Sequence, residues 1–423
     1  MKKEAVRESL EELIAKADER RRSLLVANEA KKADLPLKFL RQQAHFTTPA
    51  SDLGMVTKAV ENGLSATSKI LEKFGISKTE LGDTLGVPVS EIDAVLAGDV
   101  RSPLVMVDGE DAQALRDDVV VRGRENAVKV FTEAKWGRTL RFYRPSGLGL
   151  KYCAEDLYRV LTGVAGSSRY PIDGIIWPKV EHPDEIRWVS DVLGTIEQRL
   201  GLAENSIKLE FLVESGWALM QLPQIVHACV PRLAGIIFGI ADYSADINLP
   251  DIINDHPVCD VARALIVNQA GAVGVPAIDN MTVNYPVASK ALDEKGNKKL
   301  ILDRLKECFV DARHGYELGM DGKWVGHPAQ LFACLLAYRS ALPQAEIDDE
   351  VKKIEEYNKA VAAEVGATII SGVMSDRATD RHARAKLRKA VALGRLDPQK
   401  AASLGVITAS EAAEVVEMGK QAA

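Results

Sequence analysis

Short apolar runs that alternate with longer helical stretches dominate the sequence from residue 44 to about residue 340. Each run has the length and the flanking turn residues of a β-strand, and the segments between them have the apolar spacing of amphipathic helices. Eight parallel strands that alternate with helices close into a (β/α)8 barrel. The sequence therefore predicts an α/β protein built on a TIM barrel. The expected strands are residues 44–48, 103–108, 139–145, 173–181, 209–213, 234–238, 275–279 and 321–328.

The segments outside this alternation divide the chain of 423 residues. Residues 1–43 carry apolar side chains at helical spacing among charged ones, which predicts a helical arm that packs on the barrel or on a neighbouring subunit. Residues 44–340 are expected to form the barrel domain, which a helical insertion at 64–100 interrupts. Residues 341–423 are helical in pattern and lie outside the barrel, so we expect them to form a lid, an oligomer contact, or both.

The insertion resembles a helix-turn-helix in the spacing of its apolar residues. Its second helix offers Glu91 and Asp93 where a DNA-reading helix needs basic or polar side chains. Residues 76–99 contain one lysine against five acids, and the whole chain has a net charge of −6. These charges argue against nucleic acid as a partner. A DNA-binding regulator is the non-enzymatic alternative.

The five cysteines are scattered, with no pair at the spacing of a metal site or a disulfide framework, so we expect buried thiols. The first residues are charged throughout and lack the apolar region of a signal peptide. No apolar run reaches the length that spans a membrane. We therefore expect a cytoplasmic protein with no membrane partner.

Two acids end two consecutive strands of the expected barrel. Glu214 closes the run at 209–213, and Asp242 follows the run at 234–238 within one short turn. Because the loops after the carboxyl ends of the strands form the active face of a barrel, both carboxylates should point into one pocket. Each acid could instead cap a helix. Oxygen ligands without His or Cys favour Mg²⁺ over Zn²⁺, with Mn²⁺ as a possible substitute.

Other polar side chains are expected at the same barrel mouth. We expect Arg141 to point inward on its strand, where a guanidinium needs an acid such as Glu110 or a substrate oxygen. Helix capping and local ion pairing compete with a functional role for the remaining candidates. They are Asp108, Glu110, Asp111, Arg144, Lys179, Glu181, Asp279 and His327.

A series of motifs resembles, in order, the citrate lyase β-subunit and malyl-CoA lyase (HpcH/HpaI aldolase) family. The resemblance covers about residues 44–390 apart from the insertion. The motifs are FTTPAS (46–51), VDGEDA (107–112), LRFYRP (140–145), WPKVE (177–181), LVESGWAL (212–219), FGIADYSADI (238–247), VPAIDN (275–280), MDGKWVGHPAQL (320–331) and SGVMSDRATDRHA (371–383).

The resemblance implies a TIM barrel that binds Mg²⁺ and cleaves or forms a carbon–carbon bond between an acyl-CoA and a 2-oxo acid. By position, Glu214 and Asp242 match the two metal-ligating carboxylates of the family. Arg141 matches the arginine that faces the substrate carbonyl. Glu110 and Asp111 match an acid pair that supports the metal-bound waters and that arginine.

Asp376 matches an aspartate of the family's C-terminal segment, which closes over a neighbouring subunit's barrel and acts in proton transfer. The resemblance therefore implies a homotrimer or homohexamer. The chain departs from the family pattern at Gly109, Tyr143 and Val373, where the family usually has Leu, Asn and Lys. These departures bear on the substrate and the CoA contacts more than on the metal site.

Three enzyme activities remain open at this point. The first is a lyase of malyl-CoA, citramalyl-CoA, citryl-CoA or a related CoA ester. The second is condensation with thioester hydrolysis, as in malate synthases. The third is a class II pyruvate aldolase that uses no CoA, against which the C-terminal SGVMSD segment argues.

Overall fold

The structure is a computed structural model, and it describes residues 3–29, 31–166, 169–364, 367–370 and 373–422. Eight parallel strands close into one barrel in chain order, and the last strand pairs with the first. This topology confirms the predicted (β/α)8 barrel. The strands are β1 (Ala44–Pro49), β2 (Leu104–Asp108), β3 (Leu140–Arg144), β4 (Gly174–Trp177), β5 (Lys208–Val213), β6 (Leu233–Phe238), β7 (Ala277–Asp279) and β8 (Gly322–Val325).

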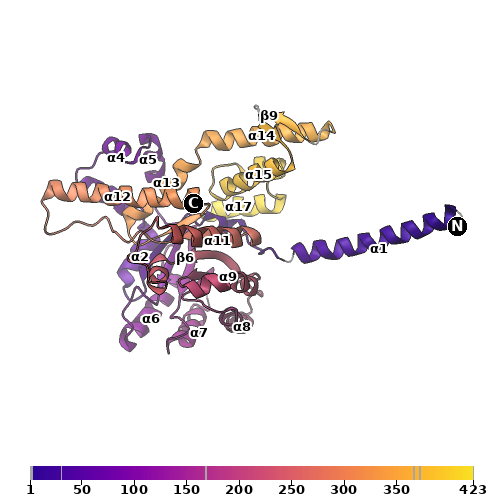
Figure 1. Cartoon of the computed structure of the whole chain (residues 1–423). Helices are drawn as coiled ribbons and strands as arrows, with labels where there is room; N and C mark the ends of the chain where they lie inside the picture. The colour runs from indigo at the N-terminus through magenta and orange to yellow at the C-terminus, as the bar shows by residue number, and fades with distance from the viewer. Residues whose placement is uncertain (1–2, 30, 167–168, 365–366, 371–372, 423) are drawn as a thin grey trace.

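Amphipathic helices follow the strands and cover the outside of the barrel (Figure 1). In one of them, α8 (Pro183–Leu200), a capping box between His182 and Glu185 fixes the start, and Gly201 in the left-handed conformation ends the helix. The other helices of the barrel domain are α2 (Leu53–Asn62), α6 (Asp117–Glu133), α7 (Cys153–Gly163), α9 (Gly216–Cys229), α10 (Ile240–Asp246), α11 (Pro257–Val273), α12 (Glu294–Glu317) and α13 (Pro328–Ala341).

Alternate side chains of each strand fill the barrel interior. On β3, Leu140 and Phe142 belong to this inner core, and Phe39 of the short helix η1 (Leu37–Arg41) packs edge-on against Phe142. Because strand side chains alternate, Arg144 shares the inward parity of Leu140 and Phe142. The expectation that Arg141 points inward is therefore wrong: its guanidinium lies outside, 5.6 Å from the ring of Trp136.

The insertion consists of α3 (Ser65–Lys73), α4 (Lys78–Leu85) and α5 (Val89–Leu96). Its two ends meet, because the backbone N–H of Leu64 donates to the carbonyl of Val100 at 2.7 Å. On α5, Ile92 is buried and Glu91 forms an ion pair with Arg339 of α13. Helix α5, the second helix of the resemblance to a helix-turn-helix, thus uses its apolar face and an acid to dock on the barrel.

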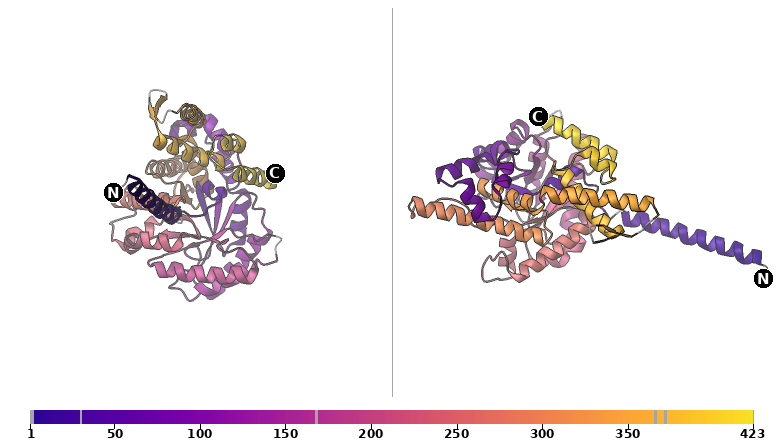
Figure 2. Two further views of the ribbon diagram at one scale, coloured as in Figure 1. Left: turned by 90° about the vertical axis from the view of Figure 1, so that its right-hand side faces the viewer. Right: turned by 90° about the horizontal axis from the view of Figure 1, so that it is seen from above.

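The N-terminal helix α1 (Lys3–Glu29) extends away from the barrel, as Figure 1 and the right-hand view of Figure 2 show. Its apolar residues Leu10, Leu13 and Ile14 are each more than half exposed. These side chains are therefore available to another surface.

The C-terminal elements gather on one side of the barrel (Figure 2). Leu387 and Val391 share a core with Leu37 of η1, which precedes β1. The C-terminal region therefore packs at the amino-terminal end of the barrel. Its elements are α14 (Gln344–Ala362), β9 (Thr368–Ile370), β10 (Val373–Ser375), α15 (Arg377–Ala392), α16 (Pro398–Ser403) and α17 (Ala409–Ala422).

All five cysteines are free and buried, as expected. Within the described ranges, the helices lack the combination of length and apolar character that crossing a membrane requires.

Asp279 ends β7 but does not reach the barrel mouth, which corrects its expected place there. It is wholly buried, and its carboxylate accepts hydrogen bonds from Arg263 Nε at 2.7 Å and from Lys323 Nζ at 3.3 Å. Three buried charges thus compensate one another between β7, β8 and α11.

We predict that Asp279→Asn lowers the free energy of unfolding by about 3–5 kcal/mol, because it removes the buried carboxylate that Arg263 and Lys323 share and leaves Asp260 as the remaining ion-pair partner of Arg263. Urea denaturation followed by circular dichroism measures the change. Asp118→Asn is the control, because Asp118 forms an exposed pair with Arg116 and its loss should change the midpoint little. Equal midpoints for both variants would contradict the structural role of Asp279.

Candidate active site

A buried ion pair between neighbouring strands fixes the carboxyl end of the barrel. Arg144 of β3 donates to both carboxylate oxygens of Asp108 of β2, with Nε–Oδ1 at 2.7 Å and Nη2–Oδ2 at 2.6 Å. Asp108 also accepts from the backbone N–H groups of Glu110 and Ala112. One carboxylate therefore orients the guanidinium and also holds the loop that follows β2.

The third nitrogen of Arg144 faces the site. Its Nη1 is buried without a hydrogen-bond partner among the described residues, and it lies 3.5 Å from Glu110 Oε2. The guanidinium also lies 5.2 Å from the ring of Trp324. Arg144 therefore offers one N–H donor to an oxygen of a bound ligand.

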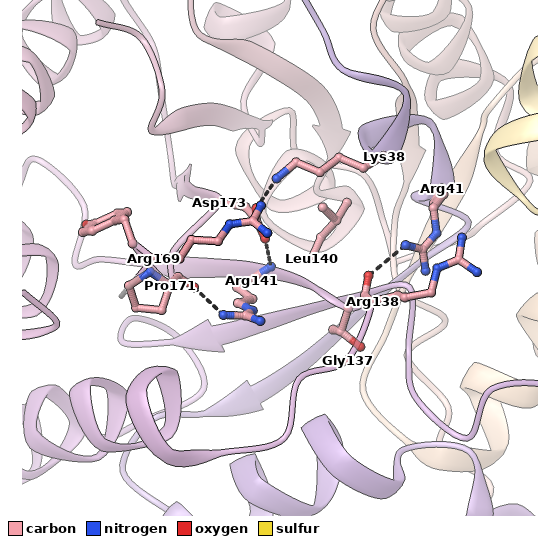
Figure 3. Close-up of a pocket in the computed structure, with 11 residues that line it drawn as sticks. Lys38, Arg41, Gly137, Arg138, Leu140, Arg141, Arg169, Pro171 and Asp173 are labelled. Atoms are coloured by element: carbon pink, nitrogen blue, oxygen red, sulfur yellow. Dashed lines mark hydrogen bonds and ion pairs between the residues drawn. The ribbon is translucent and has the colours of Figure 1, made fainter. Parts of the chain in front are cut away.

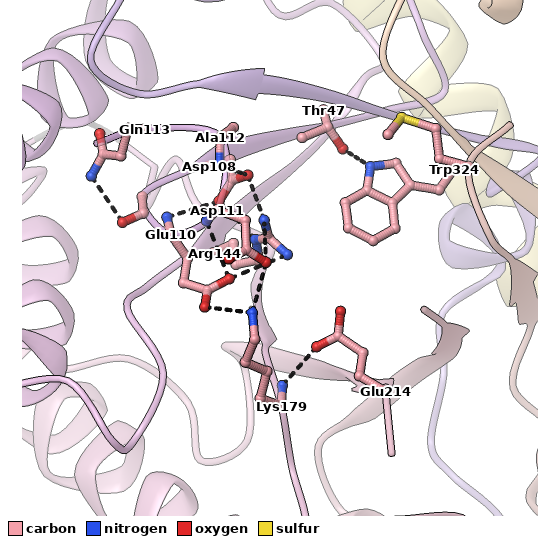
Figure 4. Close-up of polar contacts among 12 residues, drawn as sticks. Thr47, Asp108, Glu110, Asp111, Ala112, Gln113, Arg144, Lys179, Glu214 and Trp324 are labelled. Atoms are coloured by element: carbon pink, nitrogen blue, oxygen red, sulfur yellow. Dashed lines mark hydrogen bonds and ion pairs between the residues drawn. The ribbon is translucent and has the colours of Figure 1, made fainter. Parts of the chain in front are cut away.

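Lys179 connects the acids of the site (Figure 4). Its Nζ donates to Glu110 Oε1 at 2.9 Å and to Asp111 Oδ2 at 2.7 Å, and its backbone N–H donates to Glu214 Oε2 at 3.0 Å. Its φ of 49° is left-handed, a conformation that is uncommon outside glycine. Both donors of one residue thereby hold three carboxylates, whereas pairing with Glu181 alone had been the alternative.

Three carboxylates that follow three different strands meet at the mouth, two from loops and one from the first turn of α10. Asp111, Glu214 and Asp242 each offer one oxygen, and these oxygens lie within 4.8 Å of one another. Glu214 is buried, whereas Asp111 and Asp242 are exposed toward the cavity side. A set of oxygen donors alone suits a hard divalent cation such as Mg²⁺. The structure thus brings Glu214 and Asp242 together and adds Asp111 to them.

A cavity of about 460 Å³ opens in front of these groups. Arg144 and the three carboxylates form its polar wall, and apolar side chains form the opposite part. A ligand with a charged end and an apolar or extended remainder fits this division. The apolar part includes Met55, Met281, Val283, Tyr285 and Trp324.

Close packing holds the buried carboxylate in place. A Cβ at Gly239, the residue after β6, would lie 2.4 Å from Glu214 Cγ. Burial raises the pKa of Glu214 to about 7, Arg144 and Lys179 pull it down, and Asp242 adds to the rise. A proton and a divalent cation would therefore compete for the carboxylate of Glu214.

Three candidate residues do not line this cavity. Arg141 lies at the amino-terminal end of the barrel and lines a different cavity. Asp376 caps α15, where its side chain accepts from the N–H groups of Ala378 and Thr379, and it does not line the cavity at the mouth. His327 caps α13 through its Nδ1, and burial lowers its pKa to about 4.

Sequence reasoning missed the roles of Asp108, Arg144 and Lys179 as the framework of the site. Side chains alternate along β3, so Arg144 lies on the same face as Leu140 and Phe142, and Arg141 lies on the other. The sequence alone did not show which face points into the barrel. No feature of the sequence indicated the left-handed backbone at Lys179, because lysine rarely adopts that conformation.

A (β/α)8 barrel with an all-oxygen acid cluster at the carboxyl ends of its strands defines a candidate metal-binding barrel of the aldolase and lyase type. The chain belongs to the family described as "Domain of unknown function (DUF6986)", which matches residues 166–418. That match extends over more than half of the chain.

Curated relatives confirm the resemblance to the malyl-CoA lyase family. The chain is 27% identical over 223 residues to L-malyl-CoA/beta-methylmalyl-CoA lyase of Haloarcula marismortui, covering 52% of this chain and 61% of that protein. It therefore spans only about three fifths of that relative. It is 25% identical over 289 residues to (3S)-malyl-CoA thioesterase of Cereibacter sphaeroides, covering 68% of this chain and 87% of that protein.

A solved structure shares the fold. A citrate lyase from Burkholderia xenovorans superposes with a TM-score of 0.60 at 20% identity, over 86% of this chain and 96% of that chain. The barrel and much of its surrounding structure are thus common to both.

We predict that divalent cations bind more tightly as the pH rises through about 7, because Glu214 must lose its proton to become a ligand. Below the raised pKa the apparent affinity should fall by up to about tenfold per pH unit, and above it the affinity should level off. Calorimetric titration with Mg²⁺ or Mn²⁺ at several pH values measures this. An affinity that stays constant from pH 5.5 to 8.5 would exclude Glu214 as a ligand with this pKa.

We also predict that Gly239→Ala weakens Mn²⁺ binding by roughly ten- to a hundredfold, because the added methyl group displaces Glu214. The backbone at Gly239 has a φ of −106°, so alanine itself causes no conformational strain. Gly147→Ala is the matched control, because its Cβ would meet only Pro178 at 3.5 Å. Mn²⁺ titration by electron paramagnetic resonance should separate the two variants, and equal affinities would contradict the packing argument.

Proposed function

We propose that the chain is a Mg²⁺-dependent carbon–carbon lyase that reversibly cleaves a 3-hydroxyacyl-CoA into an acyl-CoA and a 2-oxo acid. The convergence of Arg144 with Asp111, Glu214 and Asp242 on one cavity carries the proposal. The name of the Haloarcula relative, a malyl-CoA lyase, supports the substrate class.

Glu214, Asp242 and Asp111 would hold the cation, for which Mn²⁺ could substitute. Bound there, it would polarise the oxygens of the 2-oxo acid as a Lewis acid. Lys179 keeps Asp111 and Glu110 in place and offsets part of the negative charge when the cation is absent. Glu110 is the proposed support of Arg144, from which it lies 3.5 Å away.

The proposed cleavage breaks the bond between the hydroxyl-bearing carbon and the α-carbon of the thioester. The hydroxyl group loses its proton and becomes the carbonyl of the 2-oxo acid, while the bonding electrons move to the thioester enolate. The enolate then takes up a proton at its α-carbon. Arg144 Nη1 donates to the oxygen that carries developing charge, a type of contact worth about 3–4 kcal/mol in comparable sites.

Asp376 is the proposed proton-transfer group, supplied by a neighbouring subunit. Its pKa is lowered by the N–H groups of Thr379 and Ala378, so the carboxylate is ready to take the α-proton of an acyl-CoA in the condensing direction. The hairpin before it exposes Ile369 and Met374, which suits a contact with another chain. A homotrimer or homohexamer would satisfy this arrangement.

Hydrolysis of the thioester is a second candidate. The Cereibacter relative is named a malyl-CoA thioesterase and aligns with more of this chain than the Haloarcula lyase does. The two activities differ in their products: cleavage of malyl-CoA gives glyoxylate and acetyl-CoA, whereas hydrolysis gives malate and free CoA.

The test is a screen of malyl-CoA, citramalyl-CoA and citryl-CoA with Mg²⁺, in which the 2-oxo acid is measured as its phenylhydrazone and free CoA with a thiol reagent. We expect release of the 2-oxo acid, and we expect Glu214→Gln to reduce turnover to background while the fold persists. Glu181→Gln is the control, because Glu181 is exposed and does not line the cavity.

Metal-dependent turnover by Glu214→Gln would contradict the assignment of that residue. Free CoA without a 2-oxo acid would favour the thioesterase. Cleavage of a CoA-free 4-hydroxy-2-oxo acid, with no action on any thioester, would favour the pyruvate aldolase instead.

A further inference from the structure

A second group of charged side chains lies at the amino-terminal end of the barrel, opposite the Glu214 cluster (Figure 3). The segments that precede β1, β3 and β4 contribute them, so they come together only in the closed barrel. The group contains five cations and one acid. They are Lys38, Arg41, Arg138, Arg141, Arg169 and Asp173.

The single acid is already engaged, because Asp173 forms an ion pair with Lys38. Arg41 donates to the carbonyl of Arg138 at 2.8 Å, and Arg141 lies 3.5 Å from the carbonyl of Pro171. Within the described ranges, the guanidinium nitrogens of Arg41, Arg138 and Arg141 have no carboxylate within 4.0 Å. These three cations therefore share one small region without a direct ion pair in the described part of the chain, although Asp173 and Asp99 lie near enough to attract Arg41.

Burial makes this arrangement costly. Arg138 Nε is buried and has no hydrogen-bond partner among the described residues. Burial lowers the pKa of Arg41 to about 10, and the nearby charge of Arg138 contributes to the change. Half-buried cations repel one another and leave donors unsatisfied, so an anion that fills the space would reduce both penalties.

The group continues into an adjacent cavity of about 270 Å³, which also contains Arg41 and Arg138 in its lining. There Arg395 presents Nε and Nη2, both buried without a partner in the described part of the chain. Arg101 and Arg339 also line this cavity, but Arg101 is paired with Asp99, the acid of the lining, and Arg339 is paired with Glu91. This cavity lies where the insertion, α13 and the end of α15 meet η1.

We propose that Arg41, Arg138, Arg141 and Arg395 form an anion groove that binds a compact ligand with two or more negative charges. Arginine suits such a ligand, because its planar fork binds paired oxygens of phosphate or carboxylate groups. Pyrophosphate esters and polycarboxylates share this chemistry. The groove is separate from the mouth of the barrel, and the inference does not depend on the proposed lyase activity.

Thermal unfolding of the full-length chain tests the groove in a low-salt buffer that has been passed over a chelating resin, because no divalent cation is then left at the mouth to bind the probe. Inorganic pyrophosphate and citrate are the two probes, and they distinguish the phosphate source from the carboxylate source. We expect at least one to raise Tm in a saturable way, as a ligand specific to the folded state does. Calorimetry should give one site per chain.

Arg138→Gln separates ligand binding from a structural role. We expect it to leave Tm unchanged or higher without a probe, since it removes a half-buried cation whose Nε has no partner in the described part of the chain, and to weaken binding of the probe at least tenfold. Arg138→Lys should recover part of the affinity. Two variants should bind like the original chain: Arg116→Gln, which removes an exposed arginine paired with Asp118, and Glu214→Gln at the opposite end.

Two results would overturn the proposal. One is that neither probe raises Tm more than sodium chloride of equal ionic strength. The other is that Arg138→Gln lowers Tm without a probe and keeps the full response to it, which would assign Arg138 a structural role alone.

Discussion

The arrangement of the barrel mouth depends on the buried ion pair between Arg144 and Asp108. The two residues are direct neighbours in the register of β2 and β3, so the closed barrel itself sets their distance. Two charges taken out of water are stable together only when their geometry is good and their other hydrogen bonds are satisfied. The bidentate contact and the two loop N–H groups on Asp108 meet this condition. Arg144 then attracts Glu110, and Glu110 accepts a hydrogen bond from the side chain of Lys179. The backbone N–H of Lys179 in turn donates to Glu214.

Two departures from the family pattern turn out to be one structural change. A Cβ at Gly109 would lie 2.8 Å from the hydroxyl oxygen of Tyr143 and 3.0 Å from the carbonyl of Arg144. A leucine at 109 and a tyrosine at 143 therefore exclude each other, whereas glycine makes room for the larger ring. The pair lies directly behind Arg144, and the N–H of Gly109 also donates to that carbonyl at 2.8 Å. In this chain, the hydrogen bond from Gly109 thus holds the backbone that positions Arg144 without a side chain at 109.

The sequence was sufficient for the barrel but not for the direction of every strand side chain. Each strand is an apolar run between turn residues, and the acids Glu214 and Asp242 stand directly after two of these runs, so their common end followed from topology. Strands of a parallel barrel are buried on both faces and show no alternation of apolar and polar residues. The strand at 140–144 carries arginines at positions of opposite parity, and only the packing of Leu140 and Phe142 against the inner core decides between them. The ion pairs of Asp279 with Arg263 and Lys323 could not be predicted either, because they depend on which way its side chain points.

The two ends of the barrel differ in charge and in what covers them. Acids dominate the carboxyl end and unpaired arginines the amino end, a division that the net charge of −6 conceals. The additions to the barrel meet at the basic end: the insertion docks through Glu91 and Arg339, and the C-terminal region pairs Lys389 with Asp321. Since α15 is committed to η1 at that end, its own chain cannot bring Asp376 over the acids at the other end without undoing the core around Leu37. A lid that carries Asp376 over this mouth would therefore come from a second copy of the chain, which agrees with the proposed oligomer.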